Sequence, residues 1–406
     1  MKSDPEQPTE LFIKDFLLFC YFTDWDQYNE NRYKFATSDI DPFICTHIIY
    51  AFAQLNKDFM IANTEWNHKK LYRELINLKL QNPYLKIILS VGGWSSNQSH
   101  FSALASHPVI RRKFAKNLAR YLYYYEFDGV DIDWEYPGFN ERGGQVQDKR
   151  NLNHLLKDIR TEFDTNERVN QASLLLILTG SANTDIITSG YDILYISRYI
   201  DFITVMTYDY NGCWDTSKLI GYLSPYNDLD EKEENVHKSL SHWMDNGMAP
   251  HKILVGIAAF GRSYITPNIG NQLLLIQKWR AEHRTSDKKS KSMKPIFLNC
   301  GKTGVYKDQP GYLLYSEICE NINYKNWSVG YDNMADAPFA YSGDQFVSYE
   351  NEKSIVNKIK LIDNYNLAGA TIWSLAGDDP HGKYCENKNF PITNFVFKKL
   401  RIHYTT

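Results

Sequence analysis

The chain has 406 residues, with 45 Lys and Arg against 48 Asp and Glu, and a formal net charge of −3. This balance gives no basic surface for nucleic acid and no polybasic patch for a membrane. Charged residues are 23% and aromatic residues 15% of the chain, which excludes a disordered protein. No apolar run reaches the length of a membrane-spanning helix.

The N-terminal segment Met1–Glu10 is polar and acidic. It lacks the basic start and the apolar stretch of a signal peptide, so either a signal peptide has been removed or the protein stays inside the cell. We interpret residues 1–13 as a polar N-terminal extension.

Short apolar segments that alternate with amphipathic helices predict an α/β fold. The segments are rich in β-branched and aromatic residues without strict alternation, which is typical of parallel strands covered by helices. Helices are predicted over Pro108–Tyr125 and Glu352–Asn366, and eight such strands predict a (β/α)8 TIM barrel. The predicted strands are Phe16–Tyr21, Thr46–Ala53, Leu85–Gly92, Gly129–Glu135, Ser173–Thr179, Phe202–Tyr208, Ile253–Phe260 and Ala368–Leu375.

More than a hundred residues separate the seventh predicted strand from the eighth. The stretch 263–338 is polar, aromatic and turn-rich, and it is too long for a loop. We therefore predict a small inserted α+β domain over 263–338, with residues 14–262 and 339–400 forming the barrel.

The segment Phe127–Gly138 carries carboxylates at alternating positions, Asp131, Asp133 and Glu135. Strand side chains alternate, so all three point to one face at successive distances of about 6.6–6.8 Å. In a parallel barrel this face looks into the interior, and the Tyr-Pro-Gly turn marks the mouth where active sites of this fold lie. Like charges at this range raise the pKa of at least one carboxyl, as a general acid requires. We expect Glu135, nearest the mouth, to be the acid and the two aspartates to form a relay behind it.

Two other interpretations of these carboxylates stay open: an inert buried set paired with Arg or Lys, and a carboxylate metal site. The sequence has no His or Cys cluster for a transition metal, and the neighbouring residues are aromatic. We therefore expect no metal and no cofactor. Asp128 has the opposite phase on the strand and is expected to anchor the start of the strand.

The pattern Asp128-Gly129-x-Asp131-x-Asp133-x-Glu135 resembles the D-x-x-D-x-D-x-E signature of family 18 glycoside hydrolases, the chitinases and chitinase-like lectins. The resemblance runs from about Lys14 to Leu400. It implies a (β/α)8 barrel with an α+β insertion between strand seven and helix seven. Further segments that resemble the family are Cys20–Trp25, Cys45–Phe52, Ser90–Trp94, Met206–Asp209, Ala337–Tyr341 and Ala370–Trp373.

The resemblance also implies a substrate-assisted mechanism on β-1,4-linked N-acetylglucosamine. Glu135 would protonate the glycosidic oxygen while the substrate's acetamido oxygen attacks C1 to form an oxazolinium ion, which water then opens with net retention. Asp133 would orient the acetamido N–H, and Tyr208 would hold the acetamido oxygen.

Other residues are implied to support this centre. Ser90 and Tyr21 would stabilise charge on Asp131, and Trp373 would form the floor under the sugar. We assign a packing role to the tryptophans Trp66, Trp243, Trp279 and Trp327. The residues that the resemblance places at the substrate are Tyr21, Trp25, Phe52, Ser90, Trp94, Tyr136, Met206, Asp209, Trp214, Arg262 and Trp373.

The same resemblance implies how four of the six cysteines pair. It implies the disulfides Cys20–Cys45 and Cys319–Cys385. Cys213 and Cys300 have no family partner, and a bridge between them is a hypothesis. Disulfides favour a secreted protein.

Two positions depart from the family pattern. Phe260 stands where animal chitinases usually carry Tyr, and Thr371 replaces the usual Met, so we expect altered affinity for the substrate and unchanged chemistry. The leading hypothesis is a secreted, monomeric chitinase that acts on chitin or chitooligosaccharides. The alternatives are a chitinase-like lectin and an endo-β-N-acetylglucosaminidase that cleaves N-glycans.

Overall fold

The computed structural model of the protein describes residues 17–30, 33–165, 173–215, 221–227, 234–266 and 299–403. The predicted extension over residues 1–13 lies outside these residues, as does Trp279.

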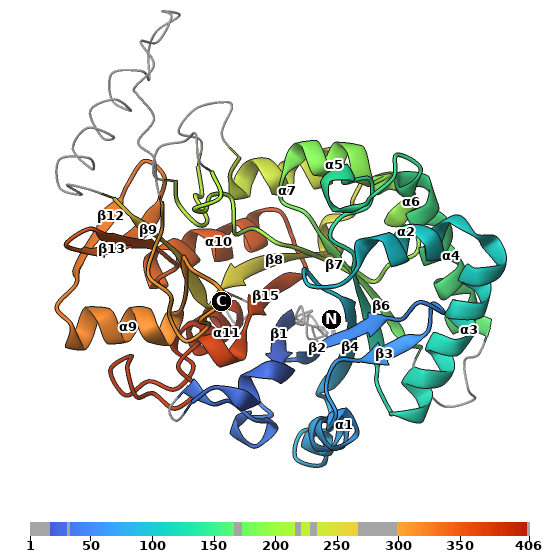
Figure 1. Ribbon diagram of the computed structural model, residues 1–406, viewed down its shortest axis with the longest axis horizontal. Coiled ribbons are helices and arrows are strands. Elements are labelled where there is room, and N and C mark those ends of the chain that lie inside the picture. Colours follow the sequence, from blue (N-terminus) through green and yellow to red (C-terminus); the bar gives the residue numbers. More distant parts are fainter. Residues whose placement is uncertain are drawn as a thin grey trace, which may run out of the picture.

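Within the described residues, eight parallel strands close into a barrel in the order β1-β15-β8-β7-β6-β5-β4-β2, and β2 pairs again with β1 (Figure 1). The predicted fold class is confirmed. The short strand β3, Ile61–Asn63, adds to β2 in antiparallel fashion. The barrel strands are β1 Leu17–Thr23, β2 His47–Leu55, β4 Lys86–Gly92, β5 Gly129–Asp133, β6 Leu175–Gly180, β7 Phe202–Val205, β8 Ile253–Ala258 and β15 Gly369–Trp373.

Helices cover the outside of the barrel (Figure 1). Their bounds are α1 His68–Asn77, α2 Gln98–Ser106, α3 Pro108–Tyr124, α4 Asp148–Thr165, α5 Thr184–Gly190, α6 Ile193–Ile196, α7 Val236–Asp245, α10 Glu352–Asn364 and α11 Pro391–His403. Pro108 suits the first turn of α3 because its fixed φ is already helical. Phe114, Leu118 and Leu122 then form the buried face of that helix. None of the helices in the described part of the chain could cross a bilayer, since none is both long and apolar enough.

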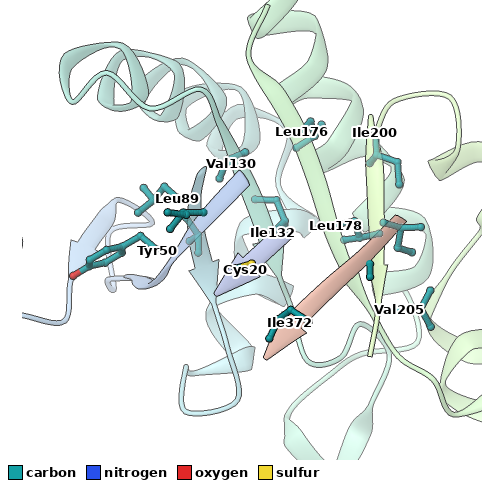
Figure 2. Packing of buried hydrophobic residues seen from close by; sticks show 14 of the residues in the cluster. Cys20, Tyr50, Leu89, Val130, Ile132, Leu176, Leu178, Ile200, Val205 and Ile372 are labelled. Carbon is teal, nitrogen blue, oxygen red and sulfur yellow. The ribbon is translucent and has the colours of Figure 1, made fainter. Parts of the chain in front are cut away.

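Strand residues alternate between two hydrophobic layers. Val130 and Ile132 of β5 and Leu178 of β6 belong to the layer between strands and helices (Figure 2). Ile177, between two such positions on β6, belongs to a separate cluster inside the barrel. By the same alternation Asp131 faces the barrel interior.

A second, antiparallel sheet lies beside the barrel together with helix α9, Tyr315–Tyr324 (Figure 1). The sheet begins before and ends after the predicted insertion 263–338. The reason is that the first strand of the insertion, β9, pairs with its last strand, β14, so that Arg262 lies opposite Ser348. The strands of this sheet are β9 Phe260–Ile265, β10 Asn299–Cys300, β11 Tyr312–Leu314, β12 Ser328–Asp332, β13 Ala337–Ser342 and β14 Gln345–Ser348.

All six cysteines form disulfides. Cys20–Cys45 joins β1 to the segment before β2, and Cys319–Cys385 joins α9 to the segment before α11. The hypothetical third bridge, Cys213–Cys300, is also present and joins the segment after β7 to β10. Three disulfides are typical of proteins that fold in an oxidising compartment.

Candidate active site

The three carboxylates follow one another from the inside of the barrel to its mouth. Asp131 and Asp133 belong to β5, and Glu135 lies two residues past its end. Their exposed fractions are 0%, 3% and 8%, so all three are buried. Gly93, after β4, donates its N–H to the backbone oxygen of Asp133 at 2.9 Å, which ties the neighbouring loop to the end of the carboxylate strand.

Asp131 accepts hydrogen bonds from three hydroxyls. Tyr21 of β1 and Ser90 of β4 donate to Oδ2 at 2.9 and 2.6 Å, and Thr179 of β6 donates to Oδ1 at 2.9 Å. Burial raises the pKa of Asp131, and the three hydrogen bonds act in the opposite direction. The predicted contacts of Tyr21 and Ser90 are therefore present. Sequence reasoning missed Thr179, although a polar residue near the carboxyl end of the strand beside the carboxylates was a usable signal.

Asp133 is less well satisfied, because its Oδ1 has no hydrogen-bond partner among the described residues. Burial, followed by the charges of Glu135 and Asp131, raises the pKa of Asp133 well above its usual value. None of the ion pairs between described side chains includes one of the three carboxylates, which argues against an inert set paired with Arg or Lys. Nor do His, Cys, Asp and Glu side chains group into a metal site within the described part of the chain.

Glu135 is held by both groups of its backbone. Its N–H donates to Oε1 of Gln98 at 3.2 Å, and its carbonyl oxygen accepts from Nε of Arg142 at 3.2 Å. Burial raises the pKa of Glu135 to about 7, against the opposing effects of a hydrogen bond from Tyr136 and the charge of Arg142. Arg142 also stacks at 3.6 Å on the ring of Trp94. Sequence reasoning missed Gln98, the first residue of α2, and Arg142, the last residue of a short 3-10 helix, because neither belongs to a recognised motif.

The segment after β7 brings a phenol and a carboxylate to the mouth. Met206 and Tyr208 lie beyond the end of the strand, which the prediction had extended to Tyr208. Asp209 accepts two hydrogen bonds from Arg262, from Nε and Nη2, both at 2.7 Å. Burial raises the pKa of Tyr208, so its hydroxyl stays protonated at neutral pH and can donate a hydrogen bond.

Four rings gather at the same end of the barrel. The ring of Trp373 lies 4.9 Å from Tyr21, 5.8 Å from Phe52 and 6.4 Å from Trp25, measured between centroids. The resemblance placed all four at the substrate, and the structure brings them together. Tyr136 lies apart from this cluster, with its ring near Phe139.

Two further rings are open to solvent. Trp94 is 56% and Trp214 52% exposed, and Arg262 lies 5.0 Å from the Trp214 ring. The prediction that Trp66 serves packing is wrong, because this side chain is 84% exposed and donates from Nε1 to the Tyr28 hydroxyl at 3.0 Å. Trp243 is fully buried, as predicted.

The two departures from the family pattern lie within the site's walls. Phe260 packs edge-on against Tyr208 at 5.6 Å and stacks on Tyr312 at 4.7 Å. Thr371 is buried, and its hydroxyl shares a hydrogen bond of 3.1 Å with Thr204 inside the barrel. Its polar group is therefore directed into the protein.

Taken together, the mouth of the barrel offers a carboxyl that can donate and recover a proton near neutral pH, a phenolic donor and several flat rings. Rings of this kind suit the faces of sugars, whose surfaces carry no charge.

Known proteins share both the sequence and the architecture. The family model described as "Glycosyl hydrolases family 18" matches residues 17–378. The oviduct-specific glycoprotein of Mesocricetus auratus is 32% identical over 386 residues, which cover 94% of this chain and 54% of that protein. The chain spans about half or less of the length of the curated relatives that it matches first.

Solved structures agree over nearly the whole chain. The Group IV chitinase of Ostrinia furnacalis is 30% identical with a TM-score of 0.82, covering 95% of this chain and 100% of that one. Human YKL-39, described as a pseudo-chitinase with retained chitooligosaccharide binding, is 27% identical with the same TM-score and the same coverage. The relatives thus include both a chitinase and a pseudo-chitinase.

Proposed function

Because the chain belongs to the glycosyl hydrolases of family 18, we propose that it is a chitinase that hydrolyses β-1,4-linked N-acetylglucosamine polymers and oligomers. The observation that carries the proposal is the carboxyl of Glu135, which lies at the barrel mouth with a pKa of about 7 and with two buried carboxyls behind it. The family resemblance implies that relatives that bind without hydrolysis typically lack an acid at the position of Glu135.

The proposed reaction uses the substrate's own acetamido group as the nucleophile. Glu135 gives its proton to the glycosidic oxygen, the bond from C1 to that oxygen breaks, and the acetamido oxygen bonds to C1 to give an oxazolinium ion. The Glu135 carboxylate then takes a proton from water as the water oxygen attacks C1. The configuration at C1 is retained, and Glu135 ends protonated, as it began.

Other side chains position the reacting sugar. Oδ1 of Asp133, a buried acceptor without a partner among the described residues, accepts the acetamido N–H. Tyr208 donates to the acetamido oxygen and so directs it at C1. Asp209, held by Arg262, binds the same sugar.

The rings supply affinity for an uncharged chain. Trp373, with Trp25 and Phe52 beside it, forms the floor of the cleft, and the exposed rings of Trp94 and Trp214 extend it. The three disulfides support secretion, and we expect a monomer that needs no cofactor.

Hydrolysis of a fluorogenic chitotrioside tests the proposal. We expect turnover by the natural protein and a loss of about 10²–10⁴-fold in kcat in Glu135→Gln, with binding of chitooligosaccharide retained. Glu317→Gln is the matched control, because Glu317 is also buried, also has a pKa raised to about 7 by burial, and lies in the insertion. Equal rates of hydrolysis for the natural protein and Glu135→Gln would refute the proposal that the protein is a chitinase that uses Glu135.

A second candidate, binding of chitooligosaccharide without hydrolysis, is favoured by the likeness to human YKL-39. Calorimetric titration with chitohexaose, combined with analysis of its products, separates the two. Binding without products supports the lectin, and shorter β-anomeric products support the retaining enzyme.

A further inference from the structure

Thr179 completes a ring of hydroxyls around the innermost carboxylate. Its Oγ1 lies 2.9 Å from Oδ1 of Asp131 and 3.0 Å from the Tyr21 hydroxyl, and its side chain is 2% exposed. Tyr21 and Ser90 both bond Oδ2. Among the residues that the structure describes, Thr179 is thus the side chain that serves the second oxygen of Asp131.

We propose that Thr179 is a positioning residue of the proposed hydrolysis: its hydroxyl holds Asp131 as the charged end of the relay, so that the proton shared by the two aspartates resides on Asp133. The inference rests on the proposed function and extends it to a residue that no motif marks.

The count of protons supports this role. When Asp131 is ionised, the three hydroxyls supply three protons, and each can point at one of its oxygens. Hydrogen bonds to a charged acceptor are about twice as strong as bonds between neutral groups. Asp133 has no such donors, and its Oδ1 has no partner in the described part of the chain. Two interacting carboxyls share their titration, so the proton favours the member whose charge is less stabilised.

The groups that face Asp131 come from five directions. Besides the three hydroxyls of β1, β4 and β6, the titratable groups are Asp133 on its own strand, Glu135 just past the end of that strand, and Tyr208 after β7. Burial raises the pKa of Tyr208, so its hydroxyl stays neutral, and the charge of Arg142 acts on Glu135. Because no ion pair between described side chains includes Asp131, none substitutes for the hydroxyls there.

The location of the shared proton matters for Glu135. When Asp133 is neutral, the negative charge lies on Asp131, which is further from Glu135. The repulsion between carboxylates is then lower when Glu135 gives up its own proton. Without the Thr179 hydroxyl, the charge shifts toward Asp133. Glu135 then has a closer negative neighbour and holds its proton more tightly.

Thr179→Val tests this directly, because it replaces the hydroxyl by a methyl group of the same shape. We expect both limbs of the pH profile of kcat/KM to shift to higher pH. The acidic limb should shift by about one pH unit, which is the size expected when a buried carboxylate loses one hydrogen bond. We expect kcat to fall by about tenfold with KM little changed. Thr179→Ser keeps the hydroxyl and should restore the profile.

Thr204→Val is the matched control, since Thr204 is another buried threonine inside the barrel and bonds Thr371 instead of a carboxylate. It should leave the profile unchanged. If Thr179→Val does not fold, Thr179→Ala removes the same hydroxyl without the added methyl. An unchanged pH profile in Thr179→Val or Thr179→Ala would overturn the proposal. A Thr179→Ser profile equal to that of Thr179→Val would also overturn it.

A second readout is independent of turnover. Titration of carboxyl carbons by NMR in protein labelled at aspartate should place the lowest titration of the Asp131–Asp133 pair about one pH unit higher in Thr179→Val. If the natural protein binds oligosaccharide without cleaving it, the proposed function fails, and this titration still decides the role of Thr179. Identical titrations in the two proteins would refute it.

Discussion

Two of the places where the described part of the chain buries ionisable side chains are built differently. Lys358 of α10 and Glu350 form an ion pair in which both side chains are fully buried. Lys358 also donates to the Ser224 hydroxyl at 2.6 Å, and Glu350 accepts from the Ser354 hydroxyl at 2.6 Å. Each charge therefore faces an opposite charge and a hydroxyl.

Among the described residues, none of the three carboxylates at the barrel mouth belongs to an ion pair, although Asp131 accepts hydrogen bonds from three hydroxyls. Asp131, Asp133 and Glu135 carry one sign, and Asp133 has an oxygen without a partner among the described residues. Burial raises the pKa of all three. The first set secures the fold, whereas the second costs stability, and such a cost is typical of a site whose groups must exchange protons.

A hydrogen bond to the backbone links the Lys358–Glu350 pair to the barrel mouth. Ser224, which binds Lys358, donates to the carbonyl oxygen of Thr207, the residue before Tyr208. The compensated pair thus supports the segment that brings the phenol to the barrel mouth.

Removing one member of the compensated pair gives the largest expected change in stability. Lys358→Met leaves the Glu350 charge buried and unpaired, and we expect a loss of about 3–5 kcal/mol in the free energy of unfolding. Urea denaturation measures it. Lys360→Met, on the exposed side of the same helix, should change stability by less than about 0.5 kcal/mol. Equal midpoints for the two variants would show that the pair does not secure the fold.

Removing a charge from the uncompensated set should have the opposite sign. Asp133→Asn removes an acid whose pKa is raised by burial and by like charges, so we expect a gain in the free energy of unfolding at pH 8 together with lower activity. An acid with a raised pKa stabilises the fold fully below its unfolded pKa near 4, and this contribution is lost as pH rises toward its folded pKa. The gain should therefore be smaller at pH 5.

Urea denaturation at pH 5 and pH 8 measures this difference. Asp245→Asn, at the exposed end of α7, removes a charge without burial and should show the same small effect at both pH values. A stability loss in Asp133→Asn that is larger at pH 8 would contradict the contrast between the two sets.

The sequence predicted the carboxylate side of this contrast because strand alternation is local. Residues two apart on a strand share a face whatever the rest of the chain does. Asp131 and Asp133 could therefore be placed inside the barrel as soon as the parallel strands were recognised. Asp128, with the opposite phase, accepts from the backbone N–H of Ile87 at 2.7 Å and anchors the strand start, as expected.

The sequence could not place contacts that depend on how distant segments align. Thr179 reaches Asp131 because β5 and β6 pair in one particular register, and Gln98 reaches Glu135 across a loop. The pairing of Ser348 with Arg262, which extends the second sheet past its predicted limits, is of the same kind. Trp66 illustrates a different difficulty, since a large ring is usually buried, although its polar neighbours Glu65 and Asn67 were a usable signal of exposure.

A third pair, Asp209 with Arg262, lies between the two extremes. The pair is compensated, but its side chains are 32% and 19% exposed, and it stands at the barrel mouth. Lys cannot make the two parallel hydrogen bonds that Arg262 makes. For Arg262→Lys we expect a stability loss of only about 0.5–1 kcal/mol and a several-fold rise in KM for chitooligosaccharide with kcat little changed.

Arg160→Lys is a close match for this variant. Arg160 of α4 pairs with Asp201, and their side chains are 15% and 33% exposed, but the pair lies away from the mouth. Arg160→Lys should lose at least as much stability, because Arg160 also donates to the carbonyl oxygens of Tyr199 and Leu174, and only Arg262→Lys should change KM. If KM rises equally in both, the Asp209–Arg262 pair acts through the fold alone, as the Lys358–Glu350 pair does, and compensated pairs at the mouth have no separate role in binding.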